Sequence, residues 1–541
     1  MLKKIYQLLS PNERRRGGWV ALTVLLRALL DFAGVAALIP LLLSLFDQTA
    51  NHSQSLLLCG AVLLFVVLKN ALVMLLARFQ SRYLLSLYQS FSRRMFINYY
   101  RRGLLFLKGK SSVQLGHEVN FVCYVFSLSI LSPLFKLCGE AILLLMMITA
   151  LVVWEPVSGL LLCLGFLPLV MFYIMVARKR LRAYGLQELE ARRQQSRTVV
   201  EAFRGYSELE ISQAFDHSLQ SFNKGLVVIN RNRLRMESLQ LLPACLSEMA
   251  IIVGIALLLL TGDGNLGVMS GIFAVAAYRM IPAVRSVLNC WATLQNASYS
   301  IDVVSEGIKE DENETTNAKE PFTFQHKIEA TNLSFHFPDG TQVLNNLSLQ
   351  IKQGERIGIQ GASGAGKSTL FNLLLGFYAP TQGNICIDGK LLTTHNRGGW
   401  HKLVGYVPQE IFIVQGSLAE NIAMGLPFDE EKMKRVLSQV QLAQWAETLP
   451  EGMNTSLGEY GSRLSGGQKQ RIGIARALYK EAEVLFFDEA TSALDNQTEQ
   501  EITDALQQLS EHHKELTLIV IAHRDSSLKF CDRIQSLSFL P

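Results

Sequence analysis

The stretch Gly361–Thr369, GASGAGKST, decides the fold of the second half of the chain. It fits the pattern G-x-x-x-x-G-K-[ST], with the strand-like ERIGIQ before it and the helix-like LFNLLLG after it. The glycines let the backbone N–H groups face phosphate oxygens, the lysine reaches the terminal phosphates, and the serine hydroxyl faces Mg²⁺. The alternative is a glycine-rich connection that binds no nucleotide, but such a connection would require neither the lysine nor the serine. The predicted nucleotide contacts are Gly361, Ser363, Gly364, Ala365, Gly366, Lys367, Ser368 and Thr369.

A second strand-like run, VLFFDE, ends in two acidic residues, Asp488 and Glu489. Carboxylates that close a buried strand are costly unless they are exposed or paired, so a purely structural role explains them poorly. We predict that Asp488 holds a metal ion and its waters. Glu489, one residue further on, is the predicted general base that takes a proton from the attacking water.

The stretch Leu464–Arg471, LSGGQKQR, also resembles a phosphate cradle, because two glycines precede a helix-like run. It lacks the lysine that such a loop normally places on a nucleotide. The free N–H groups at a helix N-terminus can still bind an anion. Such a loop therefore needs a lysine from elsewhere to complete a nucleotide site.

These three stretches, together with the DEATSALD that begins at Asp488, resemble the nucleotide-binding domain of the ATP-binding cassette, or ABC, family. The resemblance extends over Phe322–Asp532. In that family the signature loop of one cassette closes on the γ-phosphate of an ATP molecule held by another cassette, so the resemblance implies ATP, Mg²⁺ and a second copy. The signature residues implied to contact that ATP are Leu464, Ser465, Gly466, Gly467 and Gln468.

Further positions match the family pattern, and their roles are implied by that resemblance. Gln409 resembles the Q-loop glutamine that senses the metal and the γ-phosphate, His523 the switch histidine and Asp495 the D-loop acid. Phe337 stands where an aromatic residue, commonly Tyr, stacks on adenine; Phe keeps the ring face but lacks the hydroxyl. Glu459 matches the exporter-type X-loop glutamate. The implied catalytic residues are Glu489, His523, Gln409, Lys367 and Asp495, and the implied Mg²⁺ ligands are Ser368, Gln409 and Asp488.

The composition of the chain indicates a membrane protein. Of its 541 residues 49% are hydrophobic and 18% are charged, and the mean hydropathy is +0.22. Soluble proteins carry roughly 25% charged residues. The net charge of +5 is small for this length and gives no reason to expect nucleic acid as a partner. The eight cysteines show no metal-binding spacing and are expected to be free thiols.

Six apolar runs each meet the roughly 20 residues that a membrane-spanning helix needs. They are Gly18–Phe46, Gln54–Phe79, Ser129–Trp154, Pro156–Val176, Leu239–Thr261 and Gly267–Val287. The loops after the first, third and fifth runs contain no Lys or Arg, whereas the segments on the other side are rich in both. The positive-inside rule then places both termini and the cassette in the cytoplasm, with the chain in the inner (plasma) membrane.

The sequence divides into three parts. We predict an α-helical membrane domain at 1–305, an acidic linker at 306–321, and an α/β P-loop ATP-binding cassette at 322–541. The linker stretch is nearly free of apolar residues. The fold class is therefore a six-helix membrane domain followed by an α/β nucleotide-binding domain.

Two basic segments, Gln80–Arg102 and Leu186–Arg204, contain no Gly or Pro and show helical periodicity. At 1.5 Å per residue they would extend the membrane helices by roughly 30 Å into the cytoplasm. We predict that the chain turns back at Gly103, Gly116 and Gly205. Short cross-pieces, expected near 110–117 and 206–215, are then contact surfaces or simply solvated loops.

Charged residues inside the apolar runs are costly and often functional. Arg27 and Asp31 have i, i+4 spacing, and so do Lys136 and Glu140, which is compatible either with ion pairs within one helix or with a role in binding cargo. Arg285 is expected to reach the membrane surface. The remaining intramembrane charges are Lys69, Glu248 and Arg279. The predicted cargo contacts are Arg279, Arg27 and Asp31.

Six spans followed by one cassette resemble an ABC half-transporter of the exporter type, which implies a dimer, most simply a homodimer. The stretches YRMIPAVRSVLN and LLRALLDFAGVAALIPLL are similar to bacterial lipid-linked oligosaccharide flippases and related peptide exporters. The predicted function is ATP-driven movement of an amphiphilic, possibly anionic cargo out of the cytoplasm or inner leaflet. A peptide or multidrug exporter is one alternative, and a membrane ATPase that acts as a sensor without transport is another.

Overall fold

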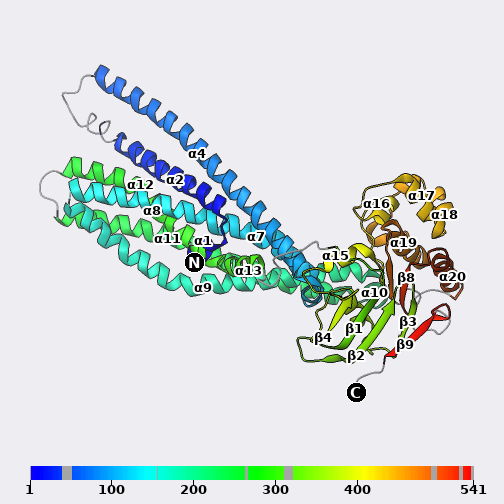
Figure 1. Ribbon diagram of the computed structural model, residues 1–541. Coiled ribbons are helices and arrows are strands. Elements are labelled where there is room, and N and C mark those ends of the chain that lie inside the picture. Colours follow the sequence, from blue (N-terminus) through cyan, green and yellow to red (C-terminus); the bar gives the residue numbers. More distant parts are fainter. Residues whose placement is uncertain are drawn as a thin grey trace. The chain divides into compact units, whose positions relative to one another are not determined.

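The computed structural model describes residues 2–38, 40, 52–154, 156–261, 266–309, 321–488, 496–522 and 528–537 of the chain. The chain divides into two compact units, Met1–Glu310 and Asp311–Pro541 (Figure 1). They are the helical unit and the α/β unit.

The helical unit consists of long helices joined by short ones. Among the described residues they are α1 (Leu2–Leu8), α2 (Pro11–Ala36), α4 (His52–Arg101), α5 (Gly103–Lys108), α6 (Ser112–His117), α7 (Cys123–Val125), α8 (Ser132–Trp154), α9 (Pro156–Arg204), α10 (Tyr206–Ile211), α11 (Phe215–Thr261), α12 (Leu266–Asn296) and α13 (Tyr299–Ile308), with π-helical turns η1 (Glu118–Val122) and η2 (Phe126–Leu131). The sequence determines where α2 begins. Ser10 and Glu13 form a reciprocal capping box, and Pro11 occupies the first helical position.

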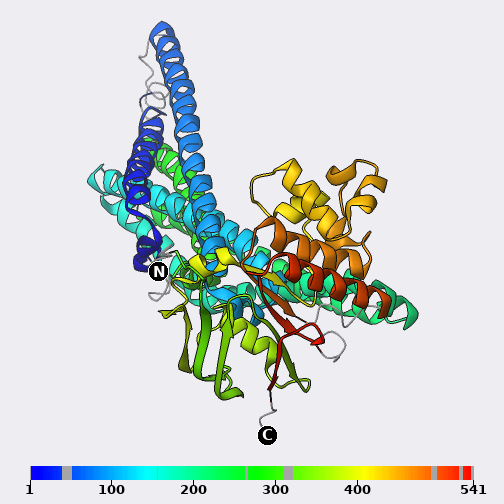
Figure 2. The ribbon, with the colours of Figure 1, turned by 45° about the vertical axis from the view of Figure 1, so that its right-hand side comes forward.

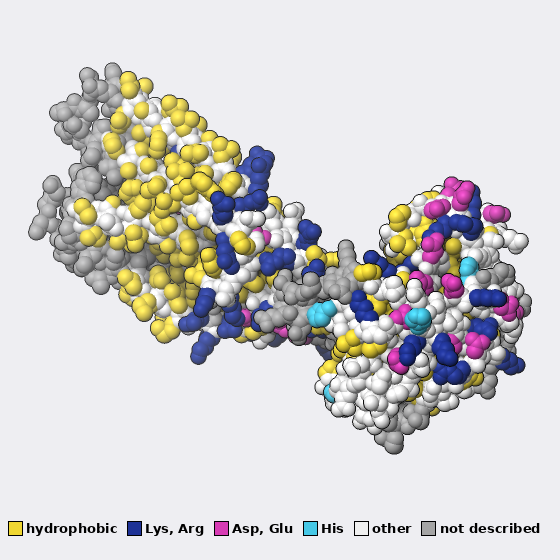
Figure 3. Space-filling model, viewed as in Figure 1, with side chains coloured by type: hydrophobic (Ala, Val, Ile, Leu, Met, Phe, Trp, Pro, Cys, Tyr) yellow, Lys and Arg dark blue, Asp and Glu magenta, His cyan; other side chains and the backbone are white. Residues whose placement is uncertain are grey.

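Three helical segments in the described part of the chain are long and apolar enough to cross a membrane: Pro11–Ala36, Leu56–Arg101 and Ser112–Val153. Long helices also cover the other three predicted runs, but spanning there stays a prediction. On α4, apolar side chains such as Leu57 and Met74 are 76% and 74% exposed, as expected for a surface that faces lipid. Figure 3 shows apolar side chains over much of this bundle and Lys and Arg gathered toward one end.

The predicted turns of the basic helical extensions are partly confirmed. α4 ends at Arg101 before Gly103, whose φ of +79° suits glycine, and α9 ends at Arg204 before Gly205. The prediction for Gly116 is wrong, because this residue lies inside α6. The chain turns earlier, at residues 109–111, where Gly109 follows α5 and the extended Ser111 precedes α6. The cross-pieces predicted near 110–117 and 206–215 are the short helices α6 and α10.

The far end of α4 holds the last helix of the unit. The Nδ2 of Asn98, a buried residue, donates to the carbonyl oxygens of Gly307 at 2.6 Å and Lys309 at 2.7 Å. These bonds satisfy carbonyl groups that the end of α13 leaves without helical partners. Arg102 adds a bond from its Nη2 to the Glu306 oxygen at 2.6 Å. The first residues of the predicted linker, 306–309, are thus held to the extension of α4, and 306–308 belong to the helix α13.

The α/β unit contains two sheets among its described residues. The antiparallel sheet has the order β2-β1-β4-β5 and the parallel sheet the order β6-β7-β8-β3-β9. The strands are β1 (Lys327–His336), β2 (Gln342–Lys352), β3 (Arg356–Gly361), β4 (Gln382–Ile387), β5 (Lys390–Leu391), β6 (Val404–Val407), β7 (Val484–Asp488), β8 (Thr517–Ile521) and β9 (Arg533–Leu537). The helices are α14 (Lys367–Leu374), α15 (Arg397–Leu403), α16 (Leu418–Ala423), α17 (Glu430–Gln439), α18 (Ala443–Thr448), α19 (Gly466–Tyr479) and α20 (Asn496–His512), with 3₁₀ turns η4 (Gly452–Asn454) and η5 (Glu459–Gly461).

The strands β7 and β8 form the centre of the parallel sheet, and every residue of both is buried. Their sequences, VLFFD and TLIVI, are the continuous apolar runs typical of parallel strands covered on both faces. Phe371 of α14 packs edge to face against Phe486 of β7, with ring centroids 5.2 Å apart. Figure 2, like Figure 1, shows the antiparallel strands and the helices α16–α18 at opposite ends of the unit, with α19 between them.

Candidate functional site

The stretch Gly361–Thr369 forms a loop between β3 and α14, as its pattern predicts. Gly364 and Gly366 have φ values of +84° and +89°, in the left-handed region that glycine adopts without strain. A Cβ atom at Gly361 would lie 2.7 Å from the carbonyl oxygen of Leu537, so only glycine fits where the loop leaves the sheet. The glycines are therefore required by backbone geometry.

Lys367 begins α14, and its Nζ donates to the carbonyl oxygens of Gly361 at 2.9 Å and Ala362 at 3.2 Å. The ammonium group therefore lies inside the curl of the loop. Ser368 follows in the first helical turn, where free backbone N–H groups and the helix dipole favour an anion. Positive charge and N–H donors thus converge on one point.

The strand register brings Asp488 to the same edge of the sheet as this loop. Asp488 at the end of β7 pairs with Ile521 of β8, and Ile359 of β3 pairs with the same Ile521. The loop begins two residues after Ile359. Because the carboxyl ends of parallel strands meet at one edge, the carboxylate and the loop share that edge.

Asp488 also has a polar neighbour that the sequence did not indicate. The hydroxyl of Tyr406 on β6 lies 3.5 Å from Oδ2 of Asp488. Burial, together with the nearby Asp488 carboxylate, raises the pKa of Tyr406, so this residue stays a neutral donor. No recognisable motif marks Tyr406, because its role depends on the pairing of β6 with β7.

Phe337 follows β1 in a tight turn, with its N–H bonded to Thr341 and its carbonyl oxygen to Gly340, both at 2.9 Å. Its ring meets those of Phe335 and Tyr378 edge to face, with centroids 5.2 and 6.2 Å away. The neighbouring strand β2 touches the phosphate loop, since a Cβ at Gly366 would lie 2.9 Å from a side-chain carbon of Val343. The half-buried Phe337 ring therefore packs against Phe335 and Tyr378, beside the antiparallel sheet whose strand β2 contacts the phosphate loop.

The signature stretch forms the start of α19. Ser465 is the N-cap: its Oγ accepts from the Gln468 N–H at 3.2 Å, and Oε1 of Gln468 accepts from the Ser465 N–H at 2.9 Å. This capping box fixes the start of the helix. Ser465 and Gly466 are exposed, whereas Leu464 packs against the core. Two residues of the predicted signature loop are therefore exposed.

Gln409 lies just after β6 and is exposed. The segment that follows is held by Asn421, which is completely buried and was not predicted from the sequence. Its amide accepts from the Val414 N–H at 2.9 Å and donates to the Val414 oxygen at 2.9 Å. Arg476 of α19 in turn donates to the Asn421 carbonyl oxygen at 2.7 Å. The loop that carries Gln409 is therefore tied to the signature helix.

Three predicted catalytic residues, Glu489, Asp495 and His523, lie outside the described residues. The exposed Glu459 lies in the turn η5, between Gly458 and Tyr460, whose φ values are +78° and +51°.

The donor set fits a nucleotide with Mg²⁺. The loop around Lys367 supplies an ammonium group and N–H donors for phosphates. Oxygen ligands, which Mg²⁺ prefers, are available from Ser368, Asp488 and the amide of Gln409. No group of three or more His, Cys, Asp or Glu side chains able to hold a metal occurs in the described part of the chain.

The sequence allowed ion pairs between charged residues one turn apart on the same helix, but Asp31 pairs with residues on other helices. Asp31 accepts from Lys69 of α4 and from Arg279 of α12, both at 3.1 Å, and so joins three helices. Arg27 and Asp31, one turn apart on α2, form no ion pair with each other in the described part of the chain. The guanidinium of Arg285 donates to Ser247 and Glu248 of α11, each at 3.0 Å, and its position at the membrane surface stays a prediction.

A phosphate loop, a carboxylate at the matching strand end and a capped signature helix define an ABC-type ATP-binding domain. Residues 344–492 match the family described as ABC transporter. The predicted resemblance to an exporter-type half-transporter is confirmed.

The names of the relatives refer to different transport activities. The chain is 31% identical over 387 residues to the ATP-dependent lipid A-core flippase of Alkalilimnicola ehrlichii, covering 68% of this chain and 64% of that one. It is 38% identical over 285 residues to the leukotoxin export ATP-binding protein LtxB of Aggregatibacter actinomycetemcomitans, covering 51% and 39%. It is 41% identical over 222 residues to the uncharacterized ABC transporter ATP-binding protein YwjA of Bacillus subtilis, covering 41% and 38%. The alignments thus span less than two thirds of these relatives.

A solved structure shares the fold over nearly the whole chain. It is described as a bacterial Atm1-family ABC exporter with ATP bound, and it matches with a TM-score of 0.79 and 22% identity over 98% of this chain and 94% of that one. The chain therefore has the Atm1-type exporter fold, with an N-terminal helical unit and a C-terminal cassette.

Proposed function

We propose that the chain is one half of an ATP-driven exporter. The observation that carries the proposal is the shared sheet edge of the phosphate loop and Asp488, attached to a unit of long apolar helices. Bound ATP would supply the anhydride bond whose hydrolysis releases free energy. The fold likeness to an exporter structure supports the same conclusion.

In this proposal each residue has a limited task. The backbone N–H groups of Gly364–Lys367 bind phosphate oxygens, and Lys367 neutralises their charge. Ser368, Asp488 and the side-chain amide of Gln409 would hold Mg²⁺, which would neutralise phosphate charge. Phe337 would stack on the adenine ring, and His523 would contact the γ-phosphate. Glu489 accepts the proton from the attacking water.

The working unit in this proposal is a dimer. Ser465 and Gly466 are exposed at the start of α19, and the signature residues Leu464–Gln468 include no lysine. A second copy would bring its own Lys367 against this surface, so each site would consist of two chains. Two-fold symmetry satisfies both sites at once, which favours a homodimer.

The distribution of charge supports a location. Lys and Arg are concentrated on the extensions of α4 and α9, which by the positive-inside rule favours a cytoplasmic position for these extensions. The cassette would then face cytoplasmic ATP, with six helices crossing the inner (plasma) membrane. The short helices α6 and α10 would pass the closure of the cassettes to the bundle.

An amphiphilic, anionic cargo fits the helical unit best. Arg27, Lys69, Lys136 and Arg279 outnumber the carboxylates Asp31 and Glu140 in the region where α2, α4, α8 and α12 meet. The lipid A-core flippase relative supports a lipid-linked cargo, moved out of the cytoplasm or the inner leaflet. The leukotoxin export relative supports a peptide as the second candidate.

The first test concerns the base. Glu489→Gln should leave ATP binding within about twofold while lowering hydrolysis by a factor of at least about 100, because the amide cannot take the proton. Binding is measured with labelled ATP and hydrolysis by phosphate release from purified full-length protein. Lys367→Ala is the matched control, because it should weaken binding itself. Undiminished ATP hydrolysis by Glu489→Gln would contradict the assignment of Glu489 as the general base.

The cargo is tested in liposomes. Reconstituted protein is supplied with an undecaprenyl-linked sugar, a peptide or a dye, and transport and ATPase stimulation are measured. The proposal expects stimulation and flipping with the lipid-linked sugar. Stimulation by peptide alone would instead support the peptide exporter, and ATP hydrolysis without movement of any cargo would support a sensor.

A further inference from the structure

Contacts between α2 and α4 fix the relative depth of these two helices, which run antiparallel. The hydroxyl of Tyr83 on α4 donates to the Glu13 carbonyl oxygen of α2 at 2.9 Å, and Nε2 of Gln80 donates to Oγ1 of Thr23 at 3.1 Å. A Cβ atom at Gly17 would lie 2.9 Å from the same Tyr83 hydroxyl. The first turns of α2 therefore lie at the depth of Tyr83.

Exposed arginines gather at this depth on both helices. They are Arg15 and Arg16 on α2 and Arg78 and Arg82 on α4, and we call these four residues the arginine belt. The two on α2 lie between the residues that contact Tyr83, and Arg82 directly precedes Tyr83. Arg78 lies one helical turn from Arg82. The belt thus places four positive charges within about one helical turn of a common depth.

Apolar side chains begin next to the arginine belt, toward the middle of both helices. On α2, Trp19 and Leu22 follow Arg15 at i+4 and i+7 and so share its face, and Trp19 is 67% exposed. On α4, the exposed Phe79 precedes Arg82 at i−3 and lies on the same face. Both helices are long and apolar enough to cross a membrane. Each face therefore has cations at one end and apolar groups beyond, the order in which a phospholipid presents its phosphate and its acyl chains.

The two helices themselves carry little negative charge. The sequence of α4 contains no Asp or Glu, and α2 contains only Glu13 and Asp31. The Glu13 carboxylate is largely buried and accepts from the Ser10 N–H at 2.8 Å. Asp31 pairs with two cations on other helices, as described above. Neither carboxylate therefore neutralises the exposed face of the belt.

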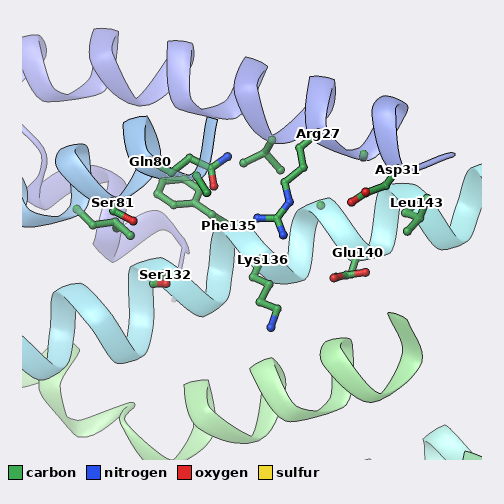
Figure 4. Close-up of a pocket in the computed structure, with 14 residues that line it drawn as sticks. Arg27, Asp31, Gln80, Ser81, Ser132, Phe135, Lys136, Glu140 and Leu143 are labelled. Atoms are coloured by element: carbon green, nitrogen blue, oxygen red, sulfur yellow. The ribbon is translucent and has the colours of Figure 1, made fainter. Parts of the chain in front are cut away.

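Arg27, the next cation along α2, is placed differently from the belt. It lines a pocket between α2, α4 and α8, and Figure 4 shows its side chain reaching from α2 toward α8. The belt arginines are exposed instead. The belt is therefore separate from the charges proposed to meet the cargo.

An exposed basic surface bordered by exposed apolar side chains fits an anionic lipid, because guanidinium groups form charge-assisted hydrogen bonds with phosphate. A second copy of this chain is a poorer occupant, because its own helical extensions are basic and like charges repel. We propose that the arginine belt binds the phosphate groups of anionic phospholipids, whose acyl chains lie along Trp19 and Phe79. This goes beyond the exporter function and requires only that α2 and α4 cross a bilayer.

Selective lipid retention tests the proposal. The full-length protein is placed in phosphatidylcholine nanodiscs with a minor fraction of phosphatidylglycerol of the same acyl chains, and the lipids that stay bound are counted by native mass spectrometry. Wild type should retain phosphatidylglycerol in excess of its share of the nanodisc. Arg78→Gln/Arg82→Gln and Arg15→Gln/Arg16→Gln should each lower this excess by at least about fivefold, as expected for cations near an anionic surface. Lysine at the same positions keeps the charge and should keep most of the excess.

Arg93→Gln/Arg101→Gln is the matched control. It removes two exposed arginines of the same helix that lie roughly 16 and 28 Å beyond Arg82, at 1.5 Å per residue, and so farther than the Debye length of about 8 Å. The control should keep the excess. In wild type alone, raising the salt concentration from about 0.15 M to about 1 M should reduce it, because salt screens exposed charges.

No excess of phosphatidylglycerol in wild type, or an equal loss in the control pair, overturns the proposal. Belt variants that change the ratio of monomer to dimer but keep the excess also overturn it, in favour of a second copy as the occupant. A wild-type protein that retains the excess but hydrolyses no ATP would contradict the proposed exporter function and leave the lipid-binding belt standing.

Discussion

The two units place their charged groups in opposite ways. In the α/β unit Lys367 and Asp488 reach one point because a loop and a strand end there, and the strand register fixes both. In the helical unit Asp31 meets Lys69 and Arg279 only because three helices pack together, although the residues are far apart in the sequence. The first arrangement is made by backbone geometry and the second by side chains that cross between helices. The second kind should be the more sensitive to single substitutions.

The largest effect on stability is expected at Asp31. Asp31→Asn keeps the shape of the side chain but removes the counter-charge of Lys69 and Arg279, which costs about 3 kcal/mol for a largely buried pair and less for this partly buried cluster. Thermal unfolding of the purified protein in detergent measures the loss. Lys4→Met is the control, because its ion pair with Asp302 is more than half exposed. Equal unfolding midpoints for wild type and Asp31→Asn would show that the ion cluster does not hold the helices.

An intermediate effect is expected at Asn421, where the α/β unit also depends on a side chain. Asn421→Ala leaves the Val414 N–H and carbonyl group without their partners, which costs about 2 kcal/mol. Hydrogen exchange at the Val414 amide should accelerate, and turnover should fall because the loop carrying Gln409 loses its anchor. Asn454→Ala, at an exposed position, is the control. Unchanged exchange at Val414 would contradict the assignment.

The smallest effect is expected at Asp532, which pairs with Arg356 of β3 at 2.6 Å. The Arg356 guanidinium holds the pKa of Asp532 below its usual value, so the pair stabilises β9 at neutral pH. This contribution is lost as pH falls below about 4, through the lowered pKa. The carboxylate is 44% exposed, so Asp532→Asn should cost only about 0.5 kcal/mol.

The readout for Asp532→Asn is hydrogen exchange of the β9 amides between about pH 7 and about pH 3. The difference between wild type and the variant should be constant at the upper end and vanish at the lower end. A difference that grows as the pH falls would have the wrong sign for a carboxylate with a lowered pKa.

The sequence predicted much of the cassette because its chemistry is local. The spacing around Lys367 and the acid that ends VLFFD each specify a strand, a turn and a functional atom within a few residues. Tyr406 and Asn421 were missed because their roles depend on pairing between distant segments. Residues of this kind carry no spacing signal.

The helical unit was predictable only in outline. Apolar length predicted the helices and the glycines at 103 and 205 predicted where they end, but Gly116 was misread because a glycine is also tolerated inside a short helix. The i, i+4 spacing of Arg27 and Asp31 allowed an intrahelical pair, yet packing gave Asp31 two partners on other helices. Helix packing decides such pairs, and spacing along one helix does not.

The central claim is that each ATP site is made by two chains, and mixing two inactive variants tests it most directly. One variant carries Lys367→Ala, and the other carries Gly466→Glu, which puts a carboxylate at the exposed start of α19. Each alone should hydrolyse ATP at a few per cent of the wild-type rate or less. Co-expressed, they form mixed dimers in which one site has both an intact loop and an intact signature, so about a quarter of the wild-type rate should return. No gain on mixing, or full activity in a strict monomer, would contradict the claim.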